Sequence, residues 1–205
     1  MRASPREVEV RQSARAVTVT VPTPTLRYLD EFLGLKCRDD LLRLGLFPNA
    51  KEITESLAAY HAVKRTLGDV RDLGDPRRTA VVVGDGCTPR TAAVLAFRTR
   101  WRVYSVDPQL RKYEGWAGVE RLTVVPFRVE DWSLTLDGPA VVVAVHSHAS
   151  LGEAVLRVRA PELAVIAIPC CAPQEVGSLP DLEYRDWGVW SEKRTVRVWR
   201  HVAAL

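Results

Sequence analysis

The sequence predicts an α/β fold in which helices precede a mostly parallel sheet and an antiparallel hairpin follows it. Two observations predict this order. Five short apolar segments alternate with helical or loop segments after Asp75-Pro76, which is the pattern of βαβ units. The last segment, Leu182 to Val202, has the pattern of two strands with a short connection. We therefore expect a Rossmann-like core with a C-terminal antiparallel hairpin and an N-terminal helical extension.

The composition supports one compact domain. The chain has 205 residues, of which 47% are hydrophobic, so it can bury one substantial core. We expect residues 1–74 to form an arm and a helical extension, and residues 75–205 to form the Rossmann-like core. No segment approaches the roughly 20 apolar residues of a membrane-spanning helix, so we expect no membrane partner. The composition does not indicate an oligomeric state.

The N-terminal arm lacks the apolar run of a secretory signal. Its first 16 residues hold four arginines but also two glutamates, which weakens a mitochondrial transit peptide without excluding it. Residues 17–21 alternate valine with threonine, which predicts a strand that Pro22 ends. The four cysteines show no CxxC or CxxH spacing, so we expect neither a metal site nor a disulfide framework. A reducing, cytoplasmic location fits best.

Helical patterns fill most of the extension. Thr23-Pro24 offers an N-cap and a first helical residue for a segment with apolar residues from Leu26 to Leu33. Leucines between residues 41 and 46 continue the apolar content. Asn49 is a second N-cap, followed by apolar residues on one helical face from Ile53 to Leu67. This extension either covers the substrate side of the core or simply packs against it.

The core contains five predicted strands, each a short apolar run between turn residues. They are Thr79 to Val83, Arg102 to Val106, Leu122 to Val125, Ala140 to Val145 and Leu163 to Ile168. The hairpin is predicted from Trp187 to Trp190 and from Thr195 to Val202, with a turn at residues 191–194. A plain NAD-binding fold continues with parallel units instead.

A glycine-containing loop follows the first of these strands. Gly84 and Gly86 flank Asp85, and glycines two apart at a strand end let a ligand approach the main chain closely. A helix that begins near Pro89 points its N-terminus at the same place. Proline at this position replaces the third glycine of the dinucleotide fingerprint, which weakens a pyrophosphate site. By itself the loop is equally typical of a tight strand-to-helix turn.

Two further carboxylate positions follow the next strands. Asp107 ends the second strand 21 residues after Gly86, a spacing at which an acidic side chain accepts hydrogen bonds from ribose hydroxyls. Glu130, Asp131 and Trp132 follow the third strand, where a carboxylate can bind an adenine amino group and an indole can flank the ring. Each could also be an ordinary solvated or packed residue. Their order along the strands favours a nucleoside site.

Histidines and cysteines follow the last two parallel strands. His146 and His148 lie beyond the fourth strand, where either could act as a general base or serve as a hydrogen-bonded structural residue. Cys170 and Cys171 lie beyond the fifth strand. We expect buried, inert thiols there, because free cysteine usually packs as a small hydrophobe.

The net charge of +4 comes mostly from arginine, which permits a nucleic-acid partner. The cations form two local groups, and tryptophans accompany the second. The first is Arg90, Arg98, Arg100 and Arg102; the second is Lys193, Arg194, Arg197 and Arg200, near Trp187, Trp190 and Trp199. Stacking with phosphate contact would suit RNA, whereas a solvated strand face over core tryptophans is the simpler interpretation.

The region from Thr79 to Pro173 resembles the class I S-adenosylmethionine-dependent methyltransferases. The stretch from Val145 to Cys171 also resembles one branch of them, the tRNA-methylating Trm13 and methyltransferase-like 25 group, in which a histidine after the fourth strand precedes a Cys-Cys pair after the fifth. Two positions depart from the superfamily: Val82 stands where an acidic residue is common, and Thr88 replaces the third glycine.

The resemblance implies a methyltransferase that acts on RNA or on a small-molecule nucleophile, with S-adenosylmethionine as cofactor. Two alternatives remain open: a methyltransferase-like binding or assembly protein without catalysis, suggested by Val82 and Thr88, and an NAD-type oxidoreductase. The predicted catalytic residues are His146 and His148. The predicted cofactor-binding residues are Gly84, Asp85, Gly86, Thr88, Asp107, Glu130, Asp131 and Trp132.

Overall fold

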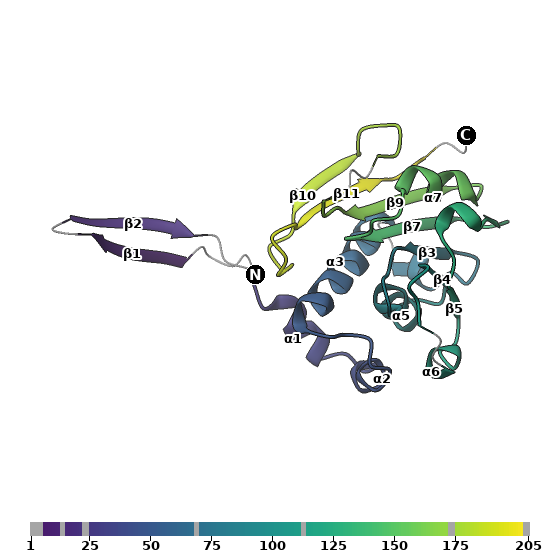
Figure 1. Cartoon of the computed structure of the whole chain (residues 1–205), viewed down its shortest axis with the longest axis horizontal. Helices are drawn as coiled ribbons and strands as arrows, with labels where there is room; N and C mark the ends of the chain where they lie inside the picture. Colours follow the sequence, from purple (N-terminus) through teal and green to yellow (C-terminus); the bar gives the residue numbers. More distant parts are fainter. Residues whose placement is uncertain are drawn as a thin grey trace.

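The computed structural model describes residues 6–12, 15–21, 25–67, 70–111, 114–171 and 175–202 (Figure 1). The helices are α1 (Arg27–Leu33), α2 (Arg38–Arg43), α3 (Ala50–Leu67), α4 (Val70–Leu73), α5 (Arg90–Arg98), α6 (Glu114–Ala117) and α7 (Leu151–Arg157), with a 3₁₀ turn η1 at Val129–Asp131. The strands are β1 (Arg6–Gln12), β2 (Arg15–Val21), β3 (Thr79–Val83), β4 (Arg102–Val106), β5 (Leu122–Val125), β6 (Leu134–Thr135), β7 (Ala140–Val145), β8 (Val158–Arg159), β9 (Leu163–Ile168), β10 (Leu182–Arg185) and β11 (Thr195–Trp199).

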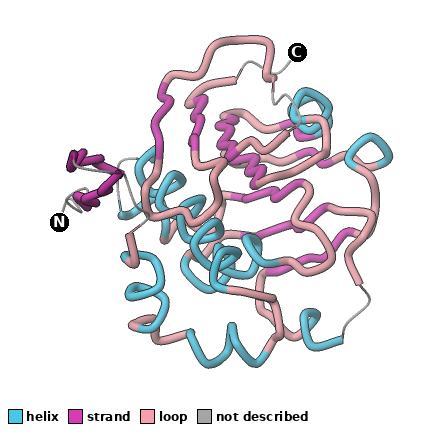
Figure 2. Tube along the Cα trace, turned by 60° about the vertical axis from the view of Figure 1, so that its left-hand side comes forward, coloured by secondary structure: helices cyan, strands magenta, loops and turns pink. Residues whose placement is uncertain are grey.

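One seven-stranded sheet organises the chain, in the order β10-β11-β9-β7-β3-β4-β5 (Figures 1 and 2). Strands β9, β7, β3, β4 and β5 run parallel, and β11 is antiparallel to both of its neighbours. The five parallel strands have the bounds that the sequence predicts. Five parallel strands closed by an antiparallel hairpin make this a Rossmann-like sheet, so the predicted fold class is confirmed.

Alternation along the strands gives the sheet two apolar faces. Ala80 and Val82 of β3 belong to the cluster that packs under α1, α3 and α5, whereas Val81 and Val83 belong to the cluster that includes the inner face of α7. Figure 1 shows α3 and α5 on one side of the sheet and α7 on the other. All five residues of β3 are buried, so this strand forms the centre of a three-layer α/β/α core.

A buried polar network joins α1 to the loop after β10. The hydroxyl of Tyr28 donates to Asp186 Oδ2 at 2.6 Å, and Arg27 donates to the other carboxylate oxygen. Gly188 lies against the Tyr28 ring, since an added Cβ would sit 2.6 Å from Tyr28 Cε2. Burial and the Asp186 carboxylate both raise the pKa of Tyr28, which keeps its hydroxyl protonated as a donor.

Asp186 also explains why the first strand of the hairpin lies earlier than predicted. β10 spans Leu182–Arg185, and the backbone from residue 187 to 190 is a turn and loop. Asp186 Oδ1 accepts from Gly188 N at 2.9 Å, and Trp190 N donates to Thr54 Oγ1 at 3.1 Å. Side chains thus occupy the amide groups that a strand would pair, and the prediction of a strand at Trp187 to Trp190 was wrong.

The N-terminal predictions are confirmed in part. β2 covers the predicted alternating valines and pairs with β1 as a separate two-stranded sheet. Asn49 caps α3, because its Oδ1 accepts from Glu52 N at 3.2 Å. The Thr23-Pro24 cap lies outside the described residues. Among the helices that the structure describes, none combines the length and apolar character needed to cross a bilayer.

Candidate cofactor and active site

The loop between β3 and α5 requires glycine at two positions. Gly84 and Gly86 have φ angles of +70° and +80°, a conformation that costs other residues about 1–2 kcal/mol. Gly84 is also tightly packed: an added Cβ would overlap Ser147 Oγ and lie 2.6 Å from Ser147 Cβ. The end of β3 is therefore in direct contact with the segment that follows β7, at the point where the strand order reverses. Ligands of open α/β sheets bind at this switch point.

Asp85, between these glycines, turns its side chain into the protein. Its two carboxylate oxygens accept from the backbone N–H groups of Thr91 and Ala92, each at 3.1 Å, and from the hydroxyl of Ser105 at 3.1 Å. Burial raises its pKa. Asp85 thus satisfies the first turn of α5 and fixes the loop, so its side chain does not serve as the cofactor contact that the sequence predicts.

Asp107 lies directly after β4 and faces the same loop. Its Oδ2 accepts from Gly86 N at 2.9 Å, and its Oδ1 accepts from Gln109 N at 2.7 Å. A carboxylate has about four acceptor sites, so these two bonds leave capacity for a ligand. Asp107 both orients the glycine loop and remains able to accept from hydroxyl groups.

A pocket of about 310 Å³ opens at the carboxyl ends of β3, β4 and β7. This volume lies at the lower end of the range for small-molecule sites. Six of the ten predicted site residues line it: Gly84, Gly86, Asp107, Glu130, His146 and His148. The other lining residues are Arg90, Val106, Pro108, Gln109, Arg128, Val129 and Ala149.

The remaining predicted residues have other roles among the described residues. Thr88 donates its hydroxyl to the carbonyl oxygen of Leu46 at 2.9 Å and so ties the glycine loop to the helical extension. Trp132 is half-buried, with its ring centre 5.8 Å from that of Tyr104. Asp131 is exposed beside it. None of the three is among the residues that line the pocket, so the adenine contacts predicted for Asp131 and Trp132 stay predictions.

His146 is held in a strained and enclosed position. Its φ is +48°, unusual for a residue with a side chain, and its backbone N–H donates to Ile168 O at 2.8 Å, which joins the ends of β7 and β9. The ring Nε2 lies 2.9 Å from Lys193 O, and Nδ1 lies 3.3 Å from Glu55 Oε1. Because a carbonyl only accepts, Nε2 carries the proton and Nδ1 faces Glu55.

Glu55 brings a buried carboxyl group from α3 to this histidine. Only 2% of the residue is exposed, and burial raises its pKa from 4.5 to about 7. Lys51 Nζ lies 3.2 Å from Glu55 Oε1, and its positive charge partly offsets the rise in the pKa of Glu55. Burial also lowers the pKa of His146. Near neutral pH the pair therefore keeps an uncharged imidazole beside a carboxyl group that is about half protonated.

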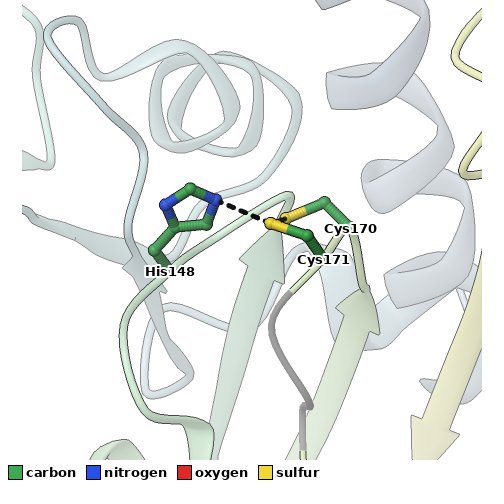
Figure 3. A group of neighbouring side chains, drawn as sticks. All are labelled: His148, Cys170 and Cys171. Atoms are coloured by element: carbon green, nitrogen blue, oxygen red, sulfur yellow. Dashed lines mark hydrogen bonds between the residues drawn. The ribbon is translucent and has the colours of Figure 1, made fainter.

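His148 meets both cysteines beyond the ends of β7 and β9 (Figure 3). Its Nε2 lies 3.3 Å from Cys171 Sγ, which lies 3.6 Å from Cys170 Sγ. Cys171 is exposed and Cys170 half-buried, so the expectation of two buried thiols was wrong. Parallel strands end at the same edge of the sheet, which is why residues more than 20 positions apart converge here.

Several of the arginines considered for RNA contact already have partners within the chain. The pairs are Arg90 with Glu52, Arg98 with the Tyr60 ring, Arg194 with the Trp187 ring and Arg197 with Glu183. Trp199 is buried, with its Nε1 donating to Ser178 O at 2.9 Å. The simpler interpretation, a solvated strand face over core tryptophans, therefore holds for Trp199, whereas Trp187 is half-buried and Trp190 is exposed.

Sequence reasoning missed Gln109 and Glu55. Gln109 follows Asp107 by two positions, so its place in the pocket wall was within reach of the same argument. Glu55 lies on a helix, where a glutamate is normally exposed, and only packing of α3 on the sheet buries it. No sequence pattern distinguishes it from its neighbour Glu52.

Comparisons with known proteins support the fold. No protein-family profile and no curated protein matches the chain. A mutant of MtNAS in complex with S-adenosylmethionine is similar in structure, with a TM-score of 0.51 and 14% identity over 84% of this chain and 70% of that one. Two further MtNAS structures are also similar. One is of a mutant and has a TM-score of 0.42 at 13% identity, and the other is a complex with MTA and tNA and has a TM-score of 0.44 at 12% identity. They cover 82% and 84% of this chain and 72% and 68% of theirs.

Proposed function

We propose that this protein binds S-adenosylmethionine in the pocket beside Gly84 and transfers its methyl group to a small nucleophile. The observation that carries the proposal is the pocket itself. It lies at the switch point of a class I methyltransferase sheet, and Gly84, Gly86 and Asp107 line it together. The MtNAS structure of similar fold was crystallised with S-adenosylmethionine, which supports the same cofactor here.

The lining residues fit the parts of this cofactor. Asp107 retains acceptor capacity for the two ribose hydroxyls. Gly86 keeps the loop backbone accessible, since an added Cβ would meet only the end of the Arg90 side chain, at 3.2 Å. Glu130 lines the same pocket after β5 and can accept from the adenine amino group. Val82 stands where an acidic residue is common in the superfamily. This difference does not alter the pocket wall, because Val82 is fully buried in the core.

When bound, the sulfonium of the cofactor supplies an electrophilic methyl group that a nucleophile attacks in line. The protein has to align that nucleophile and remove its proton. Both ring nitrogens of His146 are occupied by Lys193 O and Glu55, so we assign His146 to shaping the pocket wall. His148 lines the pocket and is exposed, and we assign contact with the acceptor to it.

A small acceptor is favoured over RNA. The pocket has the size of a small-molecule site, and several of the arginines that would contact phosphates are paired within the chain. A reducing compartment such as the cytoplasm is part of the proposal, because none of the four cysteines forms a disulfide. The antiparallel β11 makes an NAD-type oxidoreductase the weaker alternative.

Calorimetry with S-adenosylmethionine, S-adenosylhomocysteine and NADH tests the cofactor. We expect the first two to bind and NADH not to bind. Asp107→Asn should weaken binding about 10- to 100-fold, because a charged acceptor for two hydroxyls is lost while the size is kept. Asp137→Asn is the matched control, since Asp137 is an exposed loop carboxylate outside the pocket.

Absence of binding by both sulfur nucleosides would overturn the proposal, and NADH binding in their place would support the oxidoreductase. A second assay follows labelled methyl transfer to panels of thiols, amines and RNA. Transfer to a small acceptor supports the proposal. Binding of S-adenosylmethionine with no transfer to any panel would identify a methyltransferase-like binding protein.

A further inference from the structure

The sequence shows no metal motif, yet the fold assembles a set of metal-ligating side chains. His148 follows β7 by three residues, and Cys170 and Cys171 follow the neighbouring strand β9 (Figure 3). Their ligand atoms, one imidazole nitrogen and two sulfurs, all lie within 4.8 Å of one another. Among the residues that the structure describes, this is the one group of three His, Cys, Asp or Glu side chains with that property.

Two of the three separations among these atoms are close to the edges of a tetrahedral zinc site, and the third, between His148 and Cys170, is within 4.8 Å. With Zn–S near 2.3 Å and Zn–N near 2.0 Å, a tetrahedral ion separates two sulfurs by about 3.8 Å and a sulfur from a nitrogen by about 3.5 Å. The observed separations are 3.6 Å for Cys170 Sγ to Cys171 Sγ and 3.3 Å for Cys171 Sγ to His148 Nε2. Each differs from the ideal value by about 0.2 Å, so small side-chain rotations admit an ion.

The surroundings also suit a metal ion. Cys171 and His148 are exposed, which gives the ion a path from solvent. Cys170 is half-buried, and its sulfur lies 3.5 Å from His146 O. Thiolate and imidazole ligands select zinc over the oxygen-seeking ions magnesium and calcium.

We propose that His148, Cys170 and Cys171 bind one Zn²⁺ ion at the border of the pocket. Both thiols give up their protons, so two S–H bonds are replaced by two Zn–S bonds and two protons pass to solvent. Three protein ligands leave one tetrahedral position open, as in catalytic rather than structural zinc sites. Because His148 also lines the pocket, its contact with an acceptor is then made through the metal.

The open position takes water or a soft donor, and we assign it to a thiol. Zinc binds a thiol as its thiolate, which is the nucleophilic form, at neutral pH. This assignment of the acceptor class rests on the methyltransferase function proposed above. The metal site itself does not, because it depends only on the three side chains.

Metal titration of the reduced, chelator-treated protein tests the site without any cofactor. Cobalt(II) reports both geometry and ligands, since thiolate ligands give near-ultraviolet charge-transfer absorption and tetrahedral coordination gives visible bands. Competition by zinc against a chromophoric indicator then gives the zinc affinity. We expect one ion per chain. Cys170→Ser and Cys171→Ser should each halve the charge-transfer absorption, and the double variant should abolish it.

His148→Ala should weaken zinc binding by about 100-fold or more. This loss is larger than the loss expected when a residue that only supports a metal ligand is removed. Cys37→Ser is the control, because Cys37 lies beside α2 and away from the cluster. Circular dichroism verifies that each variant folds. Zinc binding that is unchanged in the Cys170→Ser/Cys171→Ser variant, or absent from the reduced wild-type protein, would overturn the proposal.

A small thiol added to the cobalt-loaded protein tests the open position. Increased charge-transfer absorption shows that the thiol has joined the metal, and an unchanged spectrum rejects the thiol assignment. S-adenosylmethionine calorimetry on the Cys170→Ser/Cys171→Ser variant keeps the two proposals apart. We expect this variant to bind the cofactor and no zinc. In the wild-type protein, cofactor binding without zinc binding refutes only the metal site, and zinc binding without cofactor binding refutes only the cofactor site.

Discussion

Gly84→Ala should destabilise the protein through two separable effects. The left-handed backbone conformation at +70° costs a residue with a Cβ about 1–2 kcal/mol. The new Cβ would also overlap Ser147 Oγ and lie 2.6 Å from Ser147 Cβ, and overpacking of this kind costs about 1–3 kcal/mol. The sum is about 2–5 kcal/mol, a large part of the roughly 5–15 kcal/mol that stabilises a typical domain.

Two other glycines provide a control for the backbone effect alone. Gly45 and Gly177 have φ angles of +63° and +78°, and an added Cβ at either would meet no atom within 4 Å. Gly45→Ala and Gly177→Ala should therefore cost only about 1–2 kcal/mol each. Urea denaturation followed by the fluorescence of the six tryptophans measures all three variants under the same conditions.

A double variant isolates the contact. Ser147→Gly removes the Oγ and Cβ that the new methyl group meets and leaves Ser147 Cα at 3.1 Å, so Gly84→Ala should cost about 1–3 kcal/mol less in that background. Ser147→Gly also removes the hydrogen bond from Ala149 N to Ser147 Oγ. This loss cancels when the cost of Gly84→Ala in the Ser147→Gly background is compared with its cost in the wild-type protein. If Gly84→Ala costs no more than the two control substitutions, the close packing of β3 against the segment after β7 is refuted.

Three further predictions concern buried polar groups. The unfolded chain releases the Glu55 proton near pH 4.5 and the folded protein releases it near pH 7, so this contribution to stability is full below pH 4.5 and falls by about 3 kcal/mol as the pH rises to 7. Glu55→Gln should flatten the dependence of the unfolding free energy on pH across this interval, and parallel curves for the two proteins would contradict the assignment. Tyr28→Phe should lower the unfolding free energy measured in urea by about 1–3 kcal/mol, because Asp186 loses a buried donor. Tyr104→Phe is the control and should cost less, because the Tyr104 hydroxyl has no hydrogen-bond partner among the described residues. Asp85→Asn should cost about 1–3 kcal/mol because an amide group cannot accept all three hydrogen bonds, and thermal unfolding at the wild-type temperature would argue against the capping role.

The sequence predicts the sheet well because each parallel strand carries its own local signal. The five runs are rich in apolar residues, above all valine, and lie between turn residues, and the structure keeps their bounds. The first hairpin strand could not be placed in the same way. Its position depends on Asp186, whose bonds to Tyr28 and Gly188 form only when distant parts of the chain are packed together.

The same distinction applies to the site. Gly84, Gly86 and Asp107 could be placed at the candidate pocket because their positions relative to the strands are regular. The inward turn of Asp85 could not, because it depends on which atoms reach the first turn of α5. The meeting of His148 with Cys170 and Cys171 depends on the adjacency of β7 and β9, whereas metal motifs in sequence are recognised by short spacing.

The contact between Tyr28 and Asp186 spans 158 positions of the chain. During synthesis from the N-terminus, α1 is complete long before the loop that holds Asp186 exists. The Tyr28 ring, 1% exposed in the folded protein, therefore has no cover from Gly188 until synthesis has passed that residue. Closing such a long loop is slow and entropically costly, so docking of α1 on this loop belongs among the late steps of folding.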